Sequence, residues 1–153
     1  MIARPARPIG AFAIAALAMT AILSAAAPPA DAQPAQPIPQ RAKVVIQVSD
    51  ADPGKWNLAL NNAKNIQTDL GAANVDIEVV AYGPGIDMLK LDSAVGGRVD
   101  EASKAGVKVI ACENTMRNQK LTKADMLSGI GYVPAGVVEL MSRQQQGWAY
   151  IRP

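Results

Sequence analysis

The sequence predicts an α/β domain built on a five-stranded, mainly parallel sheet with helices on both faces. Short runs of β-branched residues alternate along the chain with segments whose apolar residues recur at three- and four-residue spacing. The first pattern is typical of buried strands and the second of amphipathic helices. Strands that alternate with crossover helices form a parallel sheet. A chain of 153 residues is long enough for one such domain and hardly for two.

The N-terminal segment has the order of a secretory signal. Arg4 and Arg7 precede an uncharged, Ala-rich stretch, and Ala30-Asp31-Ala32 offers a small-x-small cleavage site. This order predicts a cleavable signal peptide over residues 1–32 and a periplasmic or secreted protein with no stable membrane insertion after cleavage. The alternative is a retained N-terminal anchor, although a stretch so rich in Ala would be a weak membrane span.

A linker is expected to separate this signal from the folded domain. Residues 33–41 alternate Pro with Gln and Ala, a composition that blocks helix and favours an extended spacer. The domain is therefore expected to cover residues 42–153.

A strand and a long helix are expected to open the domain. Residues 43–48 form a β-branched run that indicates a buried strand. Asp52 before Pro53 has the pattern of a helix N-cap with proline in the first turn, and Gly71 is placed to end that helix. The apolar face of the helix is expected to consist of Trp56, Leu60, Ala63, Ile66 and Leu70.

The middle of the chain predicts two further strands joined by a helix. The second strand covers residues 75–82 and is followed by a tight turn, Gly-Pro-Gly, over residues 83–85. A helix over residues 94–105 leads to the third strand, over residues 107–111, which ends at Cys112.

The last part of the chain predicts shorter elements. They are a short helix over residues 115–119, a fourth strand over residues 130–133, a helix opened by Pro134 and stopped by Gly147, and a last strand over residues 148–151. The inner side of the last helix is expected to carry Val137, Val138, Leu140 and Met141.

Composition excludes several classes of function. The chain has no histidine and one cysteine, which rules out Ser-His-Asp and Cys-His catalysis, His-ligated metals, an internal disulfide and a Cys-rich zinc site. We therefore expect neither a hydrolase nor a metalloenzyme, and no cofactor. The net charge is +2 with scattered Lys and Arg, so no nucleic-acid partner is expected.

Cys112 is the leading candidate for chemistry. Reactive groups in parallel sheets lie beyond the carboxyl ends of the strands, and Cys112 is expected where a buried strand meets the start of a helix. Backbone N–H groups at a helix start favour a thiolate, and Arg117 is one turn away. Asn114 and Thr115 are candidates to donate hydrogen bonds to the sulfur, with helix capping as the alternative for Thr115. The alternative for Cys112 itself is a buried, inert thiol.

Other residues at the same sheet edge are candidates to line a pocket. They are Asp50, Asp52, Trp56, Gly83, Gly85 and Arg117. Simpler explanations are available for most of them: capping and turn formation for the two aspartates, core packing for Trp56 and turn geometry for the glycines.

At this point the sequence resembles a known family. Residues 110–115, Ile-Ala-Cys-Glu-Asn-Thr, are similar to the Cys-x-Asn-Thr/Ser segment of the DsrE/DsrF-like family of sulfur-relay proteins. Residues 133–150 resemble the C-terminal signature of its small exported branch. The opening strand, Lys55-Trp56 at the helix start and residues 82–85 fit the same pattern, so the resemblance covers residues 43–153.

The resemblance implies a fold and an activity. The fold would be a flavodoxin-like or Rossmann-like α/β/α sandwich of the DsrE type, assembled as a homo-oligomer, a trimer or a hexamer. A cysteine at the position of Cys112 would accept sulfane sulfur as a persulfide and pass it on, which makes the chain a sulfur carrier or transferase-like protein. Its partners would be sulfur donors and acceptors, either proteins or small sulfur compounds. The characterised relay members are cytoplasmic, and this chain departs from them by its signal peptide.

Two alternatives to sulfur transfer stay open. One is a non-catalytic oligomeric binding or scaffold module of the same fold, in which Cys112 is merely structural. The weaker one is a binder of small ligands or nucleotides at the strand ends, which would need a ligand that shifts the melting temperature.

Overall fold

Five parallel strands form the central layer of the protein. The structure is a computed structural model that describes residues 41–153. The strands are β1 (Ala42–Val48), β2 (Val75–Ala81), β3 (Lys108–Cys112), β4 (Gly131–Val133) and β5 (Ala149–Ile151). They lie in the order β4-β3-β2-β1-β5, and every neighbouring pair is parallel. The predicted five-stranded α/β fold is confirmed, and the sheet is parallel throughout.

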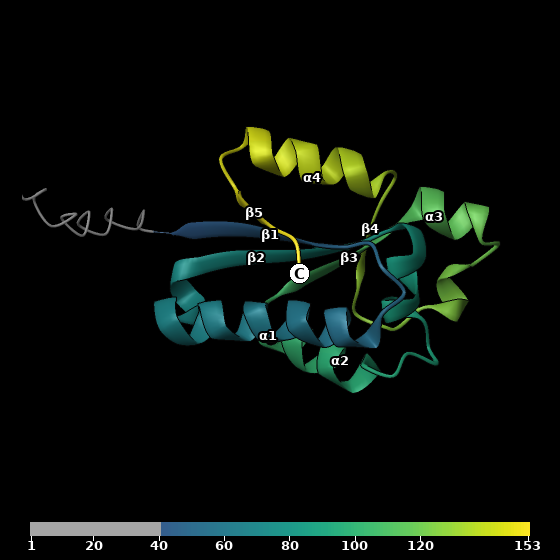
Figure 1. The fold of residues 1–153 in the computed structure, drawn as a ribbon, viewed down its shortest axis with the longest axis horizontal. Helices are drawn as coiled ribbons and strands as arrows, with labels where there is room; N and C mark the ends of the chain where they lie inside the picture. The colour runs from purple at the N-terminus through teal and green to yellow at the C-terminus, as the bar shows by residue number, and fades with distance from the viewer. Residues whose placement is uncertain (1–40) are drawn as a thin grey trace, which may run out of the picture. The chain divides into compact units, whose positions relative to one another are not determined.

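Helices cover both faces of this sheet (Figure 1). The helices are α1 (Pro53–Leu70), α2 (Gly96–Lys104), α3 (Glu113–Asn118) and α4 (Gly136–Gln145). α1 and α2 lie on one face and α4 on the other. β4 is at one edge and β5 at the opposite edge, so the chain between them crosses the whole sheet, and α4 makes this crossing. The α4 crossing brings the start of the helix over the carboxyl end of β3.

The predicted signal peptide over residues 1–32, and all but the last residue of the predicted linker over residues 33–41, lie outside the described residues. Within residues 41–153, no helix is both long enough and apolar enough to cross a membrane.

α1 begins and ends at the residues that the sequence predicts. Asp52 Oδ1 accepts a hydrogen bond of 2.7 Å from the Gly54 N–H, and Pro53 occupies the first turn. Gly71 has φ of 84°, a left-handed conformation that glycine adopts without strain, and it ends the helix. Trp56 and Leu60 on the inner face pack against the sheet, which fixes the loop between β1 and α1 at the carboxyl edge.

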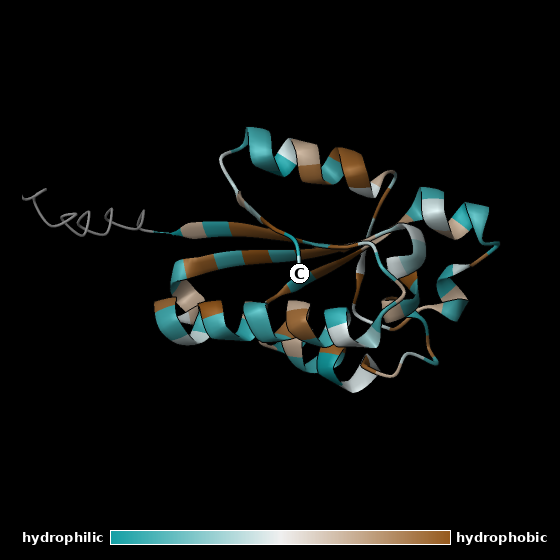
Figure 2. Ribbon diagram, viewed as in Figure 1, coloured by the Kyte–Doolittle hydropathy of each residue, from teal (hydrophilic) through white to brown (hydrophobic). Residues whose placement is uncertain are grey.

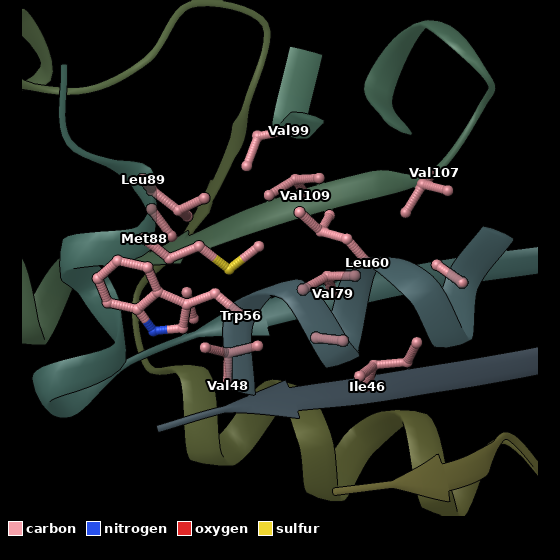
Figure 3. Close-up of a cluster of buried hydrophobic side chains, with 14 of the residues drawn as sticks. Ile46, Val48, Trp56, Leu60, Val79, Met88, Leu89, Val99, Val107 and Val109 are labelled. Carbon is pink, nitrogen blue, oxygen red and sulfur yellow. The ribbon is translucent and has the colours of Figure 1, made fainter. Parts of the chain in front are cut away.

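Two apolar clusters of unequal size hold the three layers together. The larger lies between the sheet and α1 and α2, and Figure 3 shows Ile46, Val79 and Val109 from three neighbouring strands pointing into it. The smaller lies under α4 and consists of Val45, Val80, Leu140 and Trp148. Because strand residues alternate between faces, Cys112 shares the α4 face with Ile110, whereas Ala111 faces the larger cluster.

The prediction for the inner side of α4 is wrong for three of its four residues. Val137, Val138 and Met141 are 62%, 52% and 53% exposed, and only Leu140 is buried, at 5%. Gly136 and Leu140 are the buried residues of α4, and Arg143 pairs with Glu78 on β2, so these three form the face toward the sheet. Val137, Val138 and Met141 thus form an apolar surface on α4, and in Figure 2 the ribbon of its N-terminal half carries the hydrophobic colour.

Three helix starts differ from the prediction by two residues. α2 begins at Gly96, two residues after the predicted start at residue 94. α4 begins at Gly136 with Ala135 as its N-cap, two residues after Pro134. α3 begins at Glu113, directly after Cys112 and two residues before the predicted start. The predicted turn at residues 83–85 opens a 3-10 segment, η2 (Gly83–Leu89).

Candidate functional site

Cys112 is the last residue of β3 and the N-cap of α3. The sheet and the first turn of α4 enclose it, so that it is only 4% exposed. The Gly136 N–H, at the start of α4, donates a hydrogen bond of 3.2 Å to its Sγ. The sulfur therefore lies where two helices begin, and the free N–H groups of a helix start favour an anion.

Thr115 connects the sulfur to the loop after β2. Its Oγ1 accepts a hydrogen bond of 2.9 Å from the Gly83 N–H, which leaves the hydroxyl proton free for Cys112 Sγ. The Asn114 N–H donates to the carbonyl of Pro134 at 3.1 Å and so ties α3 to the segment before α4. Three loops thus meet at the thiol.

Opposing effects act on the thiol pKa. Burial raises the pKa of Cys112, whereas hydrogen bonds from the Thr115 hydroxyl and from the Gly136 and Thr115 N–H groups lower it. The hydrogen bonds outweigh burial, and the pKa lies below the ordinary value of a thiol. A larger fraction of Cys112 is therefore thiolate near neutral pH, and the thiolate is the nucleophilic form.

Close packing favours glycine at position 136. A Cβ there would lie 3.0 Å from Tyr82 Cβ, 3.2 Å from Cys112 Cβ and 3.3 Å from Val80 Cγ1. A side chain there would require α4 or its neighbours to shift by a few tenths of an ångström. Sequence reasoning missed Gly136 and Tyr82 as site residues, although both lie in the segments that carry the family resemblance.

Asn114 and Arg117 lie at the rim of the thiol site. Both are exposed, and the Arg117 guanidinium donates a hydrogen bond to Asn114 Oδ1. Arg117 is thus held at the surface of α3, two residues further from the sulfur than Thr115. The acidic Glu113, which follows the thiol directly, has its carboxylate 4.0 Å from Lys123 Nζ.

Asp50, Asp52 and Trp56 gather at the end of β1. Asp52 caps α1, and the buried Trp56 indole donates a hydrogen bond of 2.7 Å to the carbonyl of Asp50. The Asp50 carboxylate lies 3.0 Å from Lys55 Nζ, and the hydrogen bond from Lys55 lowers the pKa of Asp50. These contacts hold the loop after β1, and none of them reaches the sulfur of Cys112.

The two predicted glycines of η2 hold a close backbone contact. A Cβ at Gly85 would lie 2.4 Å from the Val48 carbonyl oxygen, so only glycine fits there. Gly83 acts through its N–H, which binds Thr115. The Gly-Pro-Gly segment therefore holds the Thr115 hydroxyl next to the sulfur of Cys112, through the hydrogen bond from the Gly83 N–H.

The described residues offer little beyond this thiol for catalysis. Among residues 41–153, no three His, Cys, Asp or Glu side chains are grouped so that they could hold a metal ion. A surface cavity of about 390 Å³ lies between α1 and α2, lined by residues such as Leu60, Lys64 and Arg98, and it contains none of the predicted site residues. Nucleophilic attack by the thiolate is the chemistry that this arrangement supports.

Comparison with known proteins gives the family. The family model described as "DsrE/DsrF-like family" matches residues 42–153, which is most of the chain. The chain belongs to the DsrE/DsrF-like family. A sulfur-relay-like fold is therefore established for this DsrE/DsrF-like protein, and its single cysteine lies at a strand end within the matched residues.

Solved structures agree with this assignment. A protein of unknown function from Methanobacterium thermoautotrophicum, MTH1491, is 39% identical over 73% of this chain and 99% of its own length, with a TM-score of 0.70. The ychN protein from E. coli and the BT1422 protein of unknown function from Bacteroides thetaiotaomicron are each 15% identical and share the fold. The ychN protein matches with a TM-score of 0.61 over 73% of this chain and 99% of its own length. The BT1422 protein matches with a TM-score of 0.60 over 72% of this chain and 94% of its own length. No curated protein matches the chain.

Proposed function

We propose that this protein is an exported sulfur carrier, in which Cys112 accepts sulfane sulfur as a persulfide and passes it to another thiol. The observation that carries the proposal is the hydrogen bond from the Gly136 N–H to Cys112 Sγ, 3.2 Å long, at the start of α4. Together with Thr115 it lowers the thiol pKa in a family whose fold is that of sulfur-relay-like proteins.

The proposed chemistry uses only the groups at this site. The Cys112 thiolate attacks a sulfane sulfur, forms Cys-S-SH and later yields the outer sulfur to an acceptor thiolate. A thiol with a lowered pKa needs no neighbouring base, which suits a chain without histidine. The same N–H groups that hold the thiolate are suited to stabilise the anionic persulfide.

The apolar surface on α4 supports assembly with further copies of the chain. Val137, Val138 and Met141 are exposed on the outer side of one helix, where soluble proteins rarely place apolar residues together. We therefore include a homo-oligomer in the proposal. The same surface is what a non-catalytic scaffold module would need, so the role of Cys112 must be tested apart from assembly.

Export is the part of the proposal that rests on the first 32 residues. Mature protein should be recovered from the periplasm and trapped with an alkylating reagent during lysis. A mass gain of about 32 Da, one sulfur atom, is expected on Cys112 of a fraction of the molecules, with its loss on reduction. The Cys112→Ser variant contains no thiol and is the control.

Two results would contradict this proposal. A protein that keeps its N-terminal segment and stays with the membrane would contradict export. An unmodified Cys112 that reacts with the alkylating reagent only after unfolding would make the thiol a core residue, and the scaffold module would then account better for the fold.

A further inference from the structure

The first turn of α4 packs closely over Cys112, and only a few residues separate the thiol from solvent. The residue is 4% exposed, and Gly136, which lies against it, is buried. Other residues around the thiol reach solvent: Tyr82 and Ala135 are half-buried, and Asn114 and Val137 are exposed. The sulfur is therefore enclosed, although residues near it in the chain and at the start of α4 reach solvent.

A protein persulfide would have difficulty reaching this buried sulfur. With an S–S bond of about 2.05 Å and a bent C–S–S angle, the outer sulfur of a protein persulfide lies only about 3 Å from its own Cβ. The donor's main chain would therefore have to approach the space that the first turn of α4 occupies. That turn already packs so closely that a single Cβ at Gly136 would lie 3.2 Å from Cys112 Cβ.

The donors at the sulfur suit a small anion. The Gly136 N–H and the Thr115 hydroxyl and N–H all lower the thiol pKa through hydrogen bonds. The exposed Arg117 binds Asn114, which follows the thiol by two residues, and adds a positive charge on α3. A short chain of sulfur atoms is narrow, carries a negative charge and brings no backbone with it.

We propose that the sulfur donor of Cys112 is a small anionic sulfane-sulfur compound, a short hydropolysulfide, rather than a protein persulfide. This inference rests on the proposed function of Cys112 as a sulfur carrier. It selects one of the two classes of donor that the sequence leaves open.

The loading step balances without an oxidant. The Cys112 thiolate attacks the terminal sulfur of hydrogen trisulfide, HS–S–S⁻, and a new S–S bond forms between Sγ and that sulfur. The adjacent S–S bond of the donor breaks, and its electron pair leaves with the remaining two sulfurs, which take a proton from water. The products are Cys112–S–SH, HS–S⁻ and hydroxide, and the transferred sulfur keeps its oxidation state.

The test compares two donors on the folded protein. Inorganic polysulfide and persulfidated serum albumin are supplied at equal sulfane-sulfur concentration, and the gain of about 32 Da is followed by mass spectrometry. The matched control is the double variant Cys112→Ser/Asn118→Cys, which moves the single thiol to an exposed position at the end of α3. We expect polysulfide to load Cys112 about tenfold faster than albumin persulfide, or more, and the two donors to differ much less on the control and in urea-unfolded protein.

The outcomes separate this inference from the function on which it rests. If albumin persulfide loads folded Cys112 as fast as polysulfide does, the small-donor inference is overturned and the sulfur carrier stands. If neither donor loads Cys112 while both load the control thiol, the proposed function fails and the inference fails with it.

Discussion

Replacing Gly136 by alanine tests how the thiolate is held. The added Cβ would lie 3.0 Å from Tyr82 Cβ, 3.2 Å from Cys112 Cβ and 3.3 Å from Val80 Cγ1, so the start of α4 must move outward by a few tenths of an ångström. That movement weakens the hydrogen bond from the N–H of residue 136 to the sulfur, which is 3.2 Å long in the native protein.

The size of the effect follows from this hydrogen bond. A hydrogen bond to a charged group contributes about 1.5–3 kcal/mol, and one pKa unit corresponds to about 1.4 kcal/mol. Partial loss in Gly136→Ala should therefore raise the Cys112 pKa by about one unit. Overpacking at this position should also lower the free energy of unfolding by about 1–3 kcal/mol.

The assay is the rate of alkylation by iodoacetamide as a function of pH, read as intact mass. Cys112 is the only cysteine, so every adduct reports on it. Gly97→Ala in α2 is the matched control, because no atom lies within 4 Å of the Cβ that it adds, and its thiol pKa should equal that of the native protein. A folded Gly136→Ala protein that titrates at the native pH would refute the role assigned to this N–H.

Three further predictions follow from single contacts. Thr115→Val removes the hydroxyl that binds the sulfur and leaves the Gly83 N–H without its acceptor. The thiol pKa should therefore rise in the same alkylation assay, and the free energy of unfolding in urea should fall by about 1–3 kcal/mol. An unchanged thiol pKa would exclude the hydroxyl as a donor to the sulfur. Arg143→Leu strands the fully buried Glu78 carboxylate, now 2.8 Å from the guanidinium, and should cost about 3–5 kcal/mol at pH 7. Burial raises the pKa of Glu78, so the folded state binds more protons than the unfolded state. The loss of stability in Arg143→Leu should therefore shrink as the pH falls through the folded pKa and the carboxyl becomes neutral. A loss of stability that does not change with pH would contradict the charged state assigned to Glu78 at pH 7. Val138→Lys places a charge on the exposed face of α4. It should dissociate the proposed homo-oligomer in analytical ultracentrifugation while leaving the folded monomer intact. An assembly that is unchanged by this substitution would place the interface elsewhere.

Local sequence signals were sufficient where one residue determines the outcome. Asp52 with Pro53 starts α1, and Gly71 ends it, because a capping carboxylate and a left-handed glycine act within one turn. Cys112 was expected at a strand end, and it ends β3, because its position depends only on the apolar run before it.

The contacts that shape the site depend on the order of the strands in the sheet, which local sequence patterns do not reveal. Gly136 approaches Cys112 from 24 residues away because β4 lies beside β3 and α4 returns over both. Arg143 reaches Glu78 across 65 residues for the same reason.

Hydrophobic periodicity also failed to choose the inner side of α4. Its outer side carries more apolar residues than its inner side, where a glycine and an arginine take two of the positions. Apolar residues on an exposed surface mislead any rule that places them in the core.

The measurement that tests the account most directly is the mass of the folded protein before and after incubation with polysulfide, followed by cyanide. The account predicts a gain of about 32 Da on Cys112, its removal by cyanide as thiocyanate, and no gain in Cys112→Ser. A native thiol that stays unmodified under these conditions, while the same thiol gains sulfur in urea, would contradict a carrier and leave Cys112 as a buried residue of the fold.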